Sequence, residues 1–324
     1  MTTVQDMLFQ LGGVPVSGLM TQGKAIFVKP YSGSDSNDGR SPSGAVKTLA
    51  HALDLCTADK NDIVYLFAES NTAASTTDYQ SSTLTWNKDG VHLIGVNSGP
   101  MIGQRSRVAF VSTYDTASNL FTLSADNCLI ANIEFFAGVA GTNPTGCVLV
   151  TGQRNRFFNC QISGIGNTAN DISGAYSLKV GYPAAENIFS HCYIGLDTVI
   201  RATATQEIQI TGTGTGTRVP RTIFEDCFIA SYTSGSTFKA LATSYADRFV
   251  LLKNCTIYTV QGITSAVAPT GAISNSNLNG MVLLQNTGVF GYADVTTADD
   301  SQTYSMAPLP GVDSGVATSI DIAA

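Results

Sequence analysis

Three side chains near the middle of the chain have the types that acid–base chemistry uses. His191 lies in one short apolar run, and Glu225 and Asp226 lie in a second run of similar sequence. An imidazole and two carboxylates held over one surface can protonate a leaving oxygen and activate water, as polysaccharide lyases and glycoside hydrolases require. These three residues are the catalytic candidates if the protein is an enzyme.

The same runs carry cysteines at a constant position. Six seven-residue phrases align on their fifth residue, with separations of 27 to 35 residues. The phrases are LIANIEF (129–135), RFFNCQI (156–162), IFSHCYI (188–194), IFEDCFI (223–229), LLKNCTI (251–257) and LLQNTGV (283–289). A recurring phrase at this spacing, with no helical pattern between copies, is typical of one coil of a β-solenoid.

Each phrase alternates with period two and therefore predicts a strand with a corner. The strands 176–180, 198–202 and 238–242 are candidates for the second strand of a coil. Stacked coils place equivalent residues in columns about 4.8 Å apart. The core column is Ile133, Cys160, Cys192, Cys227 and Cys255, and it is predicted to point inward because a free cysteine behaves as a small buried hydrophobe.

The residue before each cysteine forms a second, polar column. Asp226 aligns with His191, Asn159 and Asn254, so this column is either an active site or a row of corners that hydrogen-bond their own turns. We favour the corner interpretation because asparagine recurs there, and we expect no catalytic residue. Asp197 with Arg201, and Asp247 with Arg248, have no feature that separates them from structural ion pairs.

The segments on either side of the repeat differ from it. We expect a docking arm over residues 1–23, a capping strand, loop and helix over 24–60, a parallel β-helix over 61–291 and an extended C-terminal tail over 292–324. The capping helix is predicted within 45–58, with an apolar face that includes Leu49, Ala50 and Leu53. The arm would dock through an apolar cluster of Val4, Met7, Leu8, Phe9 and Leu11.

Composition excludes several classes of partner and site. The 324 residues have a net charge of −7 and no basic run, so neither nucleic acid nor an anionic membrane is an expected partner. Seven cysteines without a CxxC pair favour neither disulfides nor zinc and point to a reduced compartment. We expect no cofactor and no metal ion, because turn formation explains the acidic loop at 34–42 better than calcium binding does.

A family resemblance starts in that loop. Ser-Asp-Ser-Asn-Asp-Gly-Arg-Ser-Pro (34–42), Lys-Thr-Leu (47–49), Asp-Ile-Val-Tyr (62–65) and Gly-Val-His-Leu-Ile-Gly (90–95) resemble the start of right-handed parallel β-helices of the pectate-lyase-like superfamily. Within it the chain is similar to virion proteins of tailed bacteriophages, both spikes and head decorations. The resemblance implies an all-β fold and a homotrimer.

Two functions are consistent with these features. The preferred one is a non-enzymatic phage virion protein that decorates and stabilises the capsid, with itself and the major capsid protein as partners. It would be made in the host cytoplasm, not secreted, and end in the virion. The alternative is a tailspike or receptor-binding protein that recognises or cleaves host surface polysaccharide, with a host glycan as a further partner.

Overall fold

The structure is a computed structural model. It describes residues 23–69, 77–97, 105–116, 119–141, 146–201, 206–214, 216–233, 239–261, 269–276, 280–297 and 302–305. The docking-arm residues Val4, Met7, Leu8, Phe9 and Leu11, and most of the tail predicted over 292–324, lie outside the described residues.

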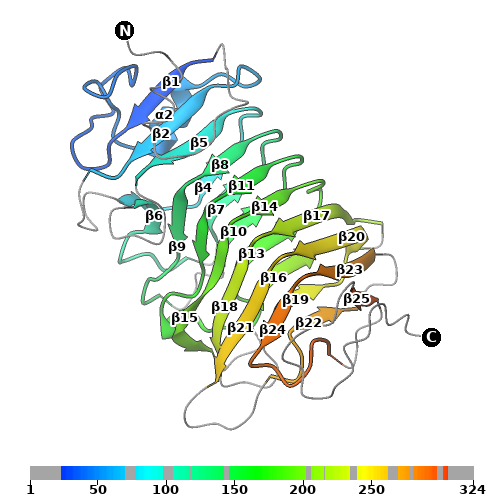
Figure 1. Cartoon of the computed structure of the whole chain (residues 1–324). Helices are drawn as coiled ribbons and strands as arrows, with labels where there is room; N and C mark the ends of the chain where they lie inside the picture. The colour runs from blue at the N-terminus through cyan, green and yellow to red at the C-terminus, as the bar shows by residue number, and fades with distance from the viewer. Residues whose placement is uncertain are drawn as a thin grey trace.

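The described chain winds through three parallel sheets, called A, B and C below (Figure 1). Sheet A contains β1 (Ala25–Val28), β2 (Ile63–Phe67), β5 (His92–Val96), β8 (Leu129–Ala131), β11 (Arg156–Phe158), β14 (Ile188–Ser190), β17 (Val219–Glu225), β20 (Ala246–Lys253), β23 (Gly280–Gln285) and β25 (Thr303–Ser305). Sheet B contains β3 (Thr77–Gln80), β6 (Ser106–Phe110), β9 (Ile133–Phe136), β12 (Gln161–Ser163), β15 (Tyr193–Arg201), β18 (Phe228–Thr233), β21 (Thr256–Gln261) and β24 (Gly288–Phe290). Sheet C contains β4 (Leu84–Trp86), β7 (Asn119–Leu123), β10 (Gly146–Val150), β13 (Tyr176–Gly181), β16 (Gln206–Thr211), β19 (Lys239–Thr243) and β22 (Ile273–Asn275).

From β2 to β24 the chain visits sheets A, B and C in turn, so each strand up to β21 pairs with the strand three places later, whereas β23 pairs with β25. Each repeated phrase supplies residues of one strand in sheet A and the start of one strand in sheet B. A single turn joins the two strands. The fold prediction is therefore confirmed: the protein is an all-β, right-handed parallel β-helix.

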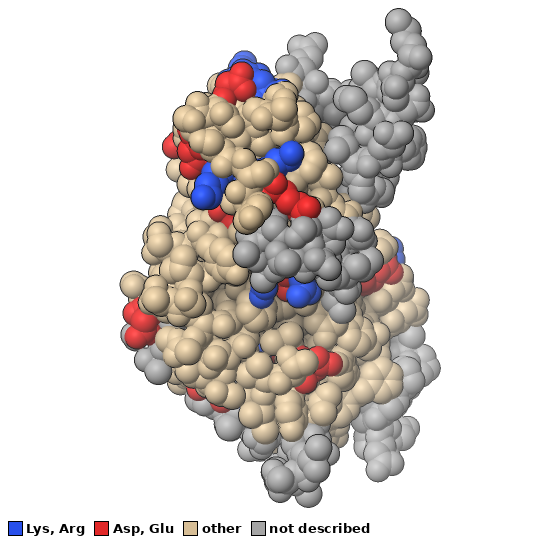
Figure 2. All heavy atoms as spheres, turned by 90° about the vertical axis from the view of Figure 1, so that its left-hand side faces the viewer, with Lys and Arg blue, Asp and Glu red and all other residues tan. Residues whose placement is uncertain are grey.

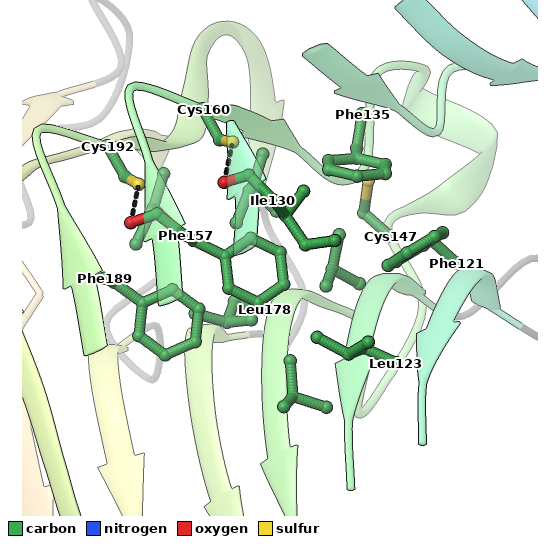
Figure 3. Close-up of a cluster of buried hydrophobic side chains, with 14 of the residues drawn as sticks. Phe121, Leu123, Ile130, Phe135, Cys147, Phe157, Cys160, Leu178, Phe189 and Cys192 are labelled. Atoms are coloured by element: carbon green, nitrogen blue, oxygen red, sulfur yellow. Dashed lines mark hydrogen bonds between the residues drawn. The ribbon is translucent and has the colours of Figure 1, made fainter. Parts of the chain in front are cut away.

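Stacked side chains from successive coils fill the interior. The rings of Phe157, Phe189 and Phe224 are parallel to within 18°, with neighbouring centroids 4.9 and 5.0 Å apart. Figure 3 shows the first two of these rings beside the cysteines of the same coils. Because parallel pairing sets equivalent residues side by side, a phrase that repeats in sequence becomes a continuous column of contacts in space.

The N-terminal end of the solenoid is covered by α2 (Leu49–Leu55). Leu49, Ala52 and Leu53 are its buried residues, whereas Ala50, predicted to face inward, is exposed. The helix begins later than expected because Thr48 caps it, its hydroxyl accepting a bond from the His51 amide. A short 3-10 helix, η1 (Thr168–Asn170), lies in a loop between sheets B and C.

Two segments differ from the sequence-based boundaries. Residues 198–201 continue β15 in sheet B after a bulge between Leu196 and Ile200, and the sheet C strand of that coil is β16 instead. Residues 303–305, placed in the tail by the sequence analysis, form β25 and pair with β23. The solenoid thus continues past residue 291.

Candidate functional site

The core column consists of buried side chains, and its thiols repeat one interaction. Ile133, Cys160, Cys192, Cys227 and Cys255 are at most 2% exposed. The thiols of Cys192, Cys227 and Cys255 donate to the carbonyl oxygens of the phenylalanines one coil earlier, at Sγ–O distances of 3.7, 3.3 and 3.5 Å. Figure 3 shows the Cys160 and Cys192 bonds. At the same position in the next coil, the Thr287 hydroxyl donates to the Leu252 carbonyl at 3.0 Å.

Their surroundings make these thiols unreactive. Burial raises the pKa of Cys192 well above its usual value. The neighbouring Cys192 thiol raises the pKa of Cys227, and the Cys227 thiol in turn raises the pKa of Cys255. Because the thiolate is both the nucleophile and the metal ligand, this column supports packing and neither redox nor metal chemistry.

The corner column shares a backbone conformation that L-amino acids rarely adopt. Its residues have φ between 49° and 56°: Asn132, Asn159, His191, Asp226, Asn254 and Asn286. Asparagine and aspartate tolerate this left-handed conformation better than most side chains. The corner amides also donate to strand ends in the next coil, as from His191 to the Glu225 carbonyl at 2.9 Å.

Hydrogen bonds between side chains run along this column. The Asn159 amide donates to Asn132 Oδ1 at 2.7 Å, and Asn254 donates to Asp226 Oδ1 at 3.2 Å. His191 Nε2 lies 3.8 Å from Asp226 Oδ2, and both side chains are about half exposed. The Glu225 carboxylate lies 3.6 Å from Lys253 Nζ. His191 and Asp226 are thus neighbours on an exposed corner whose bonds follow the backbone repeat, whereas the Glu225 carboxylate, at the end of β17, pairs with Lys253.

A buried ion pair close to the bulge of β15 was not predicted. Arg201 Nη2 lies 3.0 Å from Glu207 Oε1, and both side chains are fully buried. The same guanidinium donates to the Gly164 carbonyl at 3.0 Å, and the Ser177 hydroxyl donates to Glu207 Oε2 at 2.5 Å. Burial raises the pKa of Glu207, and the charge of Arg201 opposes that rise. Because neither side chain is exposed, we interpret the pair as a structural link between the end of β15, after its bulge, and β16 of sheet C.

Asp197, which the sequence pairs with Arg201, belongs instead to an aromatic cluster on the outside of sheet B. The Tyr258 hydroxyl donates to its carboxylate. Tyr193, Phe228 and Tyr258 follow one another across three strands, with centroid separations of 5.4 and 4.9 Å. Figure 2 views the side on which β6, β9 and β15 lie in Figure 1, and charged side chains are sparse there.

The acidic loop at 34–42 uses its carboxylates to hold its own turns. Asp35 accepts bonds from the amides of Lys47 and Thr48 and from the Thr48 hydroxyl, at 2.8 to 3.0 Å. Asp38 accepts from the Arg40 amide at 3.0 Å. These are the bonds of a turn that positions the start of α2. In the part of the chain that the structure describes, no three His, Cys, Asp or Glu residues are grouped as metal ligands.

Solved structures with the same architecture exist. Pectate lyase Pel9A matches with a TM-score of 0.61 and 14% identity, over 90% of this chain and 70% of its own. The pectin methylesterase from Aspergillus niger matches with a TM-score of 0.51 and 16% identity, over 88% of this chain and 83% of its own. ORF18 of Geobacillus virus E2 matches with a TM-score of 0.39 and 13% identity, over 93% of this chain and 62% of its own.

The fold is pectate-lyase-like. At these identities the likeness concerns the fold alone, and the last match is too distant in structure to carry any argument. No protein-family description matches the chain, and no curated protein is significantly similar to it. Among the described residues, no helix is long and apolar enough to cross a membrane.

Proposed function

We propose that the protein is a non-enzymatic structural component of a bacteriophage virion that decorates the capsid as a homotrimer. The proposal is supported by the resemblance of residues 34–95 to the start of pectate-lyase-like β-helices, by the similarity of the chain to phage virion proteins within that superfamily, and by an apolar N-terminal segment suited to docking. In this role the β-helix acts as a rigid scaffold, and residues 1–23 attach it to the major capsid protein.

One observation carries the non-enzymatic part of the proposal. The residues that have acid–base chemistry, His191 and Asp226, occupy positions that asparagine fills in the coils on either side, with the same φ. A catalytic site selects for side-chain chemistry, whereas this column selects for a backbone conformation. The imidazole and the carboxylate are therefore two of several side chains that serve one corner.

Attachment to particles tests the function directly. Heads that lack the protein are mixed with purified full-length protein or with a variant lacking residues 1–23, and bound protein is quantified after sedimentation and imaged by electron microscopy. We expect saturable binding of the full chain and none of the truncated chain. Absence of binding by the full chain would refute the decoration role, and full binding by the truncated chain would refute the role of the arm.

A second candidate function is recognition of a host surface glycan. It is favoured by the aromatic cluster on sheet B, where Phe228 is 37% exposed and Asp197 adds a carboxylate acceptor for sugar hydroxyls. Host polysaccharide immobilised on a sensor would bind the wild type and not Phe228→Ala if this function holds. Release of oligosaccharides that is lost in Asp226→Asn would instead show that the corner column is an active site.

A further inference from the structure

The outer face of sheet A carries an unusual row of apolar side chains. Ile188, Ile223, Leu251 and Leu283 stand directly beside one another in β14, β17, β20 and β23, and Tyr304 continues the row in β25. Each remains partly exposed, although its neighbours in the row cover much of its surface. Met281, beside this row in β23, is 38% exposed.

In β11 the exposed Arg156 takes the position of this row beside Ile188, and apolar side chains resume toward the N-terminal end of the sheet. There a separate apolar cluster lies on the same outer face and is centred on Ile63, Tyr65, Ile94 and Ala131. Phe158 packs against that cluster, and the guanidinium of Arg156 lies 5.8 Å from its ring centroid. Apart from Arg156, the centre of the outer face of sheet A is thus apolar, which is unusual for a face left in water.

Charged residues follow both edges of this face. Along the edge where the chain enters sheet A, Arg154 and Arg221 both pair with Glu186, and Arg248 pairs with Asp247. The opposite edge, where the chain leaves sheet A, carries Glu225 paired with Lys253 and Asp226 beside His191. The first edge thus has three arginines and two carboxylates, and the second has two carboxylates, one lysine and one histidine. An apolar centre with a charged rim is the arrangement of protein–protein interfaces.

The size of this face suits a second copy of the chain. Ten strands at about 4.8 Å spacing make the sheet about 43 Å long, and a width of about 15 Å gives about 650 Å² on each copy. With the rims included, this approaches the roughly 800 Å² per partner of a stable interface. We infer that the outer face of sheet A is the self-association surface, with the copies parallel and their sheets A facing a common axis.

The parallel arrangement follows from the rims. Rotation about an axis parallel to the solenoid brings the entry edge of one copy against the exit edge of the next. The edge with the additional arginine then faces the edge that contains Glu225 and Asp226, so the difference in charge between the two rims is complementary. This inference rests on the homotrimer of the proposed function and adds the surface that forms it.

Two matched leucine variants test the surface. Leu251→Asp places a charge in the apolar row, and Leu149→Asp places the same charge at a partly exposed position of β10 on the outer face of sheet C. Mass is measured by sedimentation velocity, with circular dichroism to follow the fold. We expect a trimer for the wild type and for Leu149→Asp, and a folded monomer for Leu251→Asp.

Cross-linking gives a readout that does not depend on the stability of Leu251→Asp. Because all seven native cysteines are buried, a surface cysteine is the only accessible thiol in a folded variant. Ile223→Cys lies near the proposed axis and should give disulfide-linked pairs on mild oxidation, whereas Leu149→Cys should not.

The outcomes separate this inference from the proposed function. A monomeric wild type would overturn both the trimer and its surface, and a trimer that persists in Leu251→Asp without cross-linking of Ile223→Cys would overturn the surface alone. A Leu251-dependent trimer that does not bind capsids would support the surface and refute the capsid role.

Discussion

The core column and the corner column come from adjacent residues of the same phrase, yet they are selected by different physical requirements. The core position accepts isoleucine, cysteine or threonine, since what it needs is a buried side chain of limited volume. The corner position accepts asparagine, histidine or aspartate, since what it needs is a residue that tolerates φ near +53°. In neither column is the reactive group itself the repeated feature.

The largest difference between the two columns should appear in chemical reactivity. At pH 8 the thiols of folded protein should react with a disulfide reagent at least about a hundred-fold more slowly than in urea, because burial removes access to them and also raises the pKa of Cys192. The exposed imidazole of His191 should be modified by diethylpyrocarbonate in the folded state. Rapid labelling of the four core-column cysteines without denaturant would contradict the inward register.

Volume changes should matter only in the core column. Cys227→Leu should lower the free energy of unfolding by about 1–3 kcal/mol, because the larger side chain overfills a closely packed coil. Asp226→Asn, one residue earlier, should change it by less than about 0.5 kcal/mol, since the amide oxygen can still accept the bond from Asn254. Urea denaturation of both variants provides the measurement. Equal effects would show that the two positions are not distinguished by burial.

The sequence predicted the parts of the fold that depend on local alternation. Six phrases with period two were sufficient to define the columns around Cys160 and Asn159, because each side chain's direction follows from its neighbours in the same strand. The bulge in β15 was missed because residues 198–201 alternate as any strand does. Their assignment to sheet B depends on pairing with Tyr232 and Thr233, a coil later.

The spacing of residues in the sequence could not identify the partners of side chains that meet only in the folded protein. Arg201 has Asp197 four residues away, but its guanidinium pairs with Glu207 of β16. A second left-handed column at the entry to sheet A was also missed. It contains Asn127, Arg154, Glu186, Arg221 and Arg248, and the sequence analysis did not use the recurrence of arginine at three of these five positions. The outer apolar row was hidden because inner and outer positions of sheet A are both hydrophobic.

Backbone conformation should control the corner column. Asn254→Ala should lower the free energy of unfolding by about 1–2 kcal/mol, the approximate cost of placing a Cβ in the left-handed region. Asn254→Gly should cost less, because glycine adopts this conformation freely. Both variants lose the same side-chain bonds, so their difference in urea midpoint isolates the backbone. A larger loss for glycine than for alanine would show that the backbone is not the determining factor.

The smallest effect is expected for His191→Asn. Asparagine tolerates the φ of 55° at this position and could donate to Asn159 in the coil before, which extends the bond pattern seen between Asn159 and Asn132. The variant loses the contact with Phe158, whose ring centroid lies 5.3 Å from that of the imidazole. These effects are opposite and similar in size, so the free energy of unfolding should change by less than about 0.5 kcal/mol. His191→Val is the matched control, because a β-branched side chain is strained at positive φ and should be clearly destabilising. Similar stability of the two variants would mean that the corner does not require a left-handed residue, and the comparison between the columns would then fail.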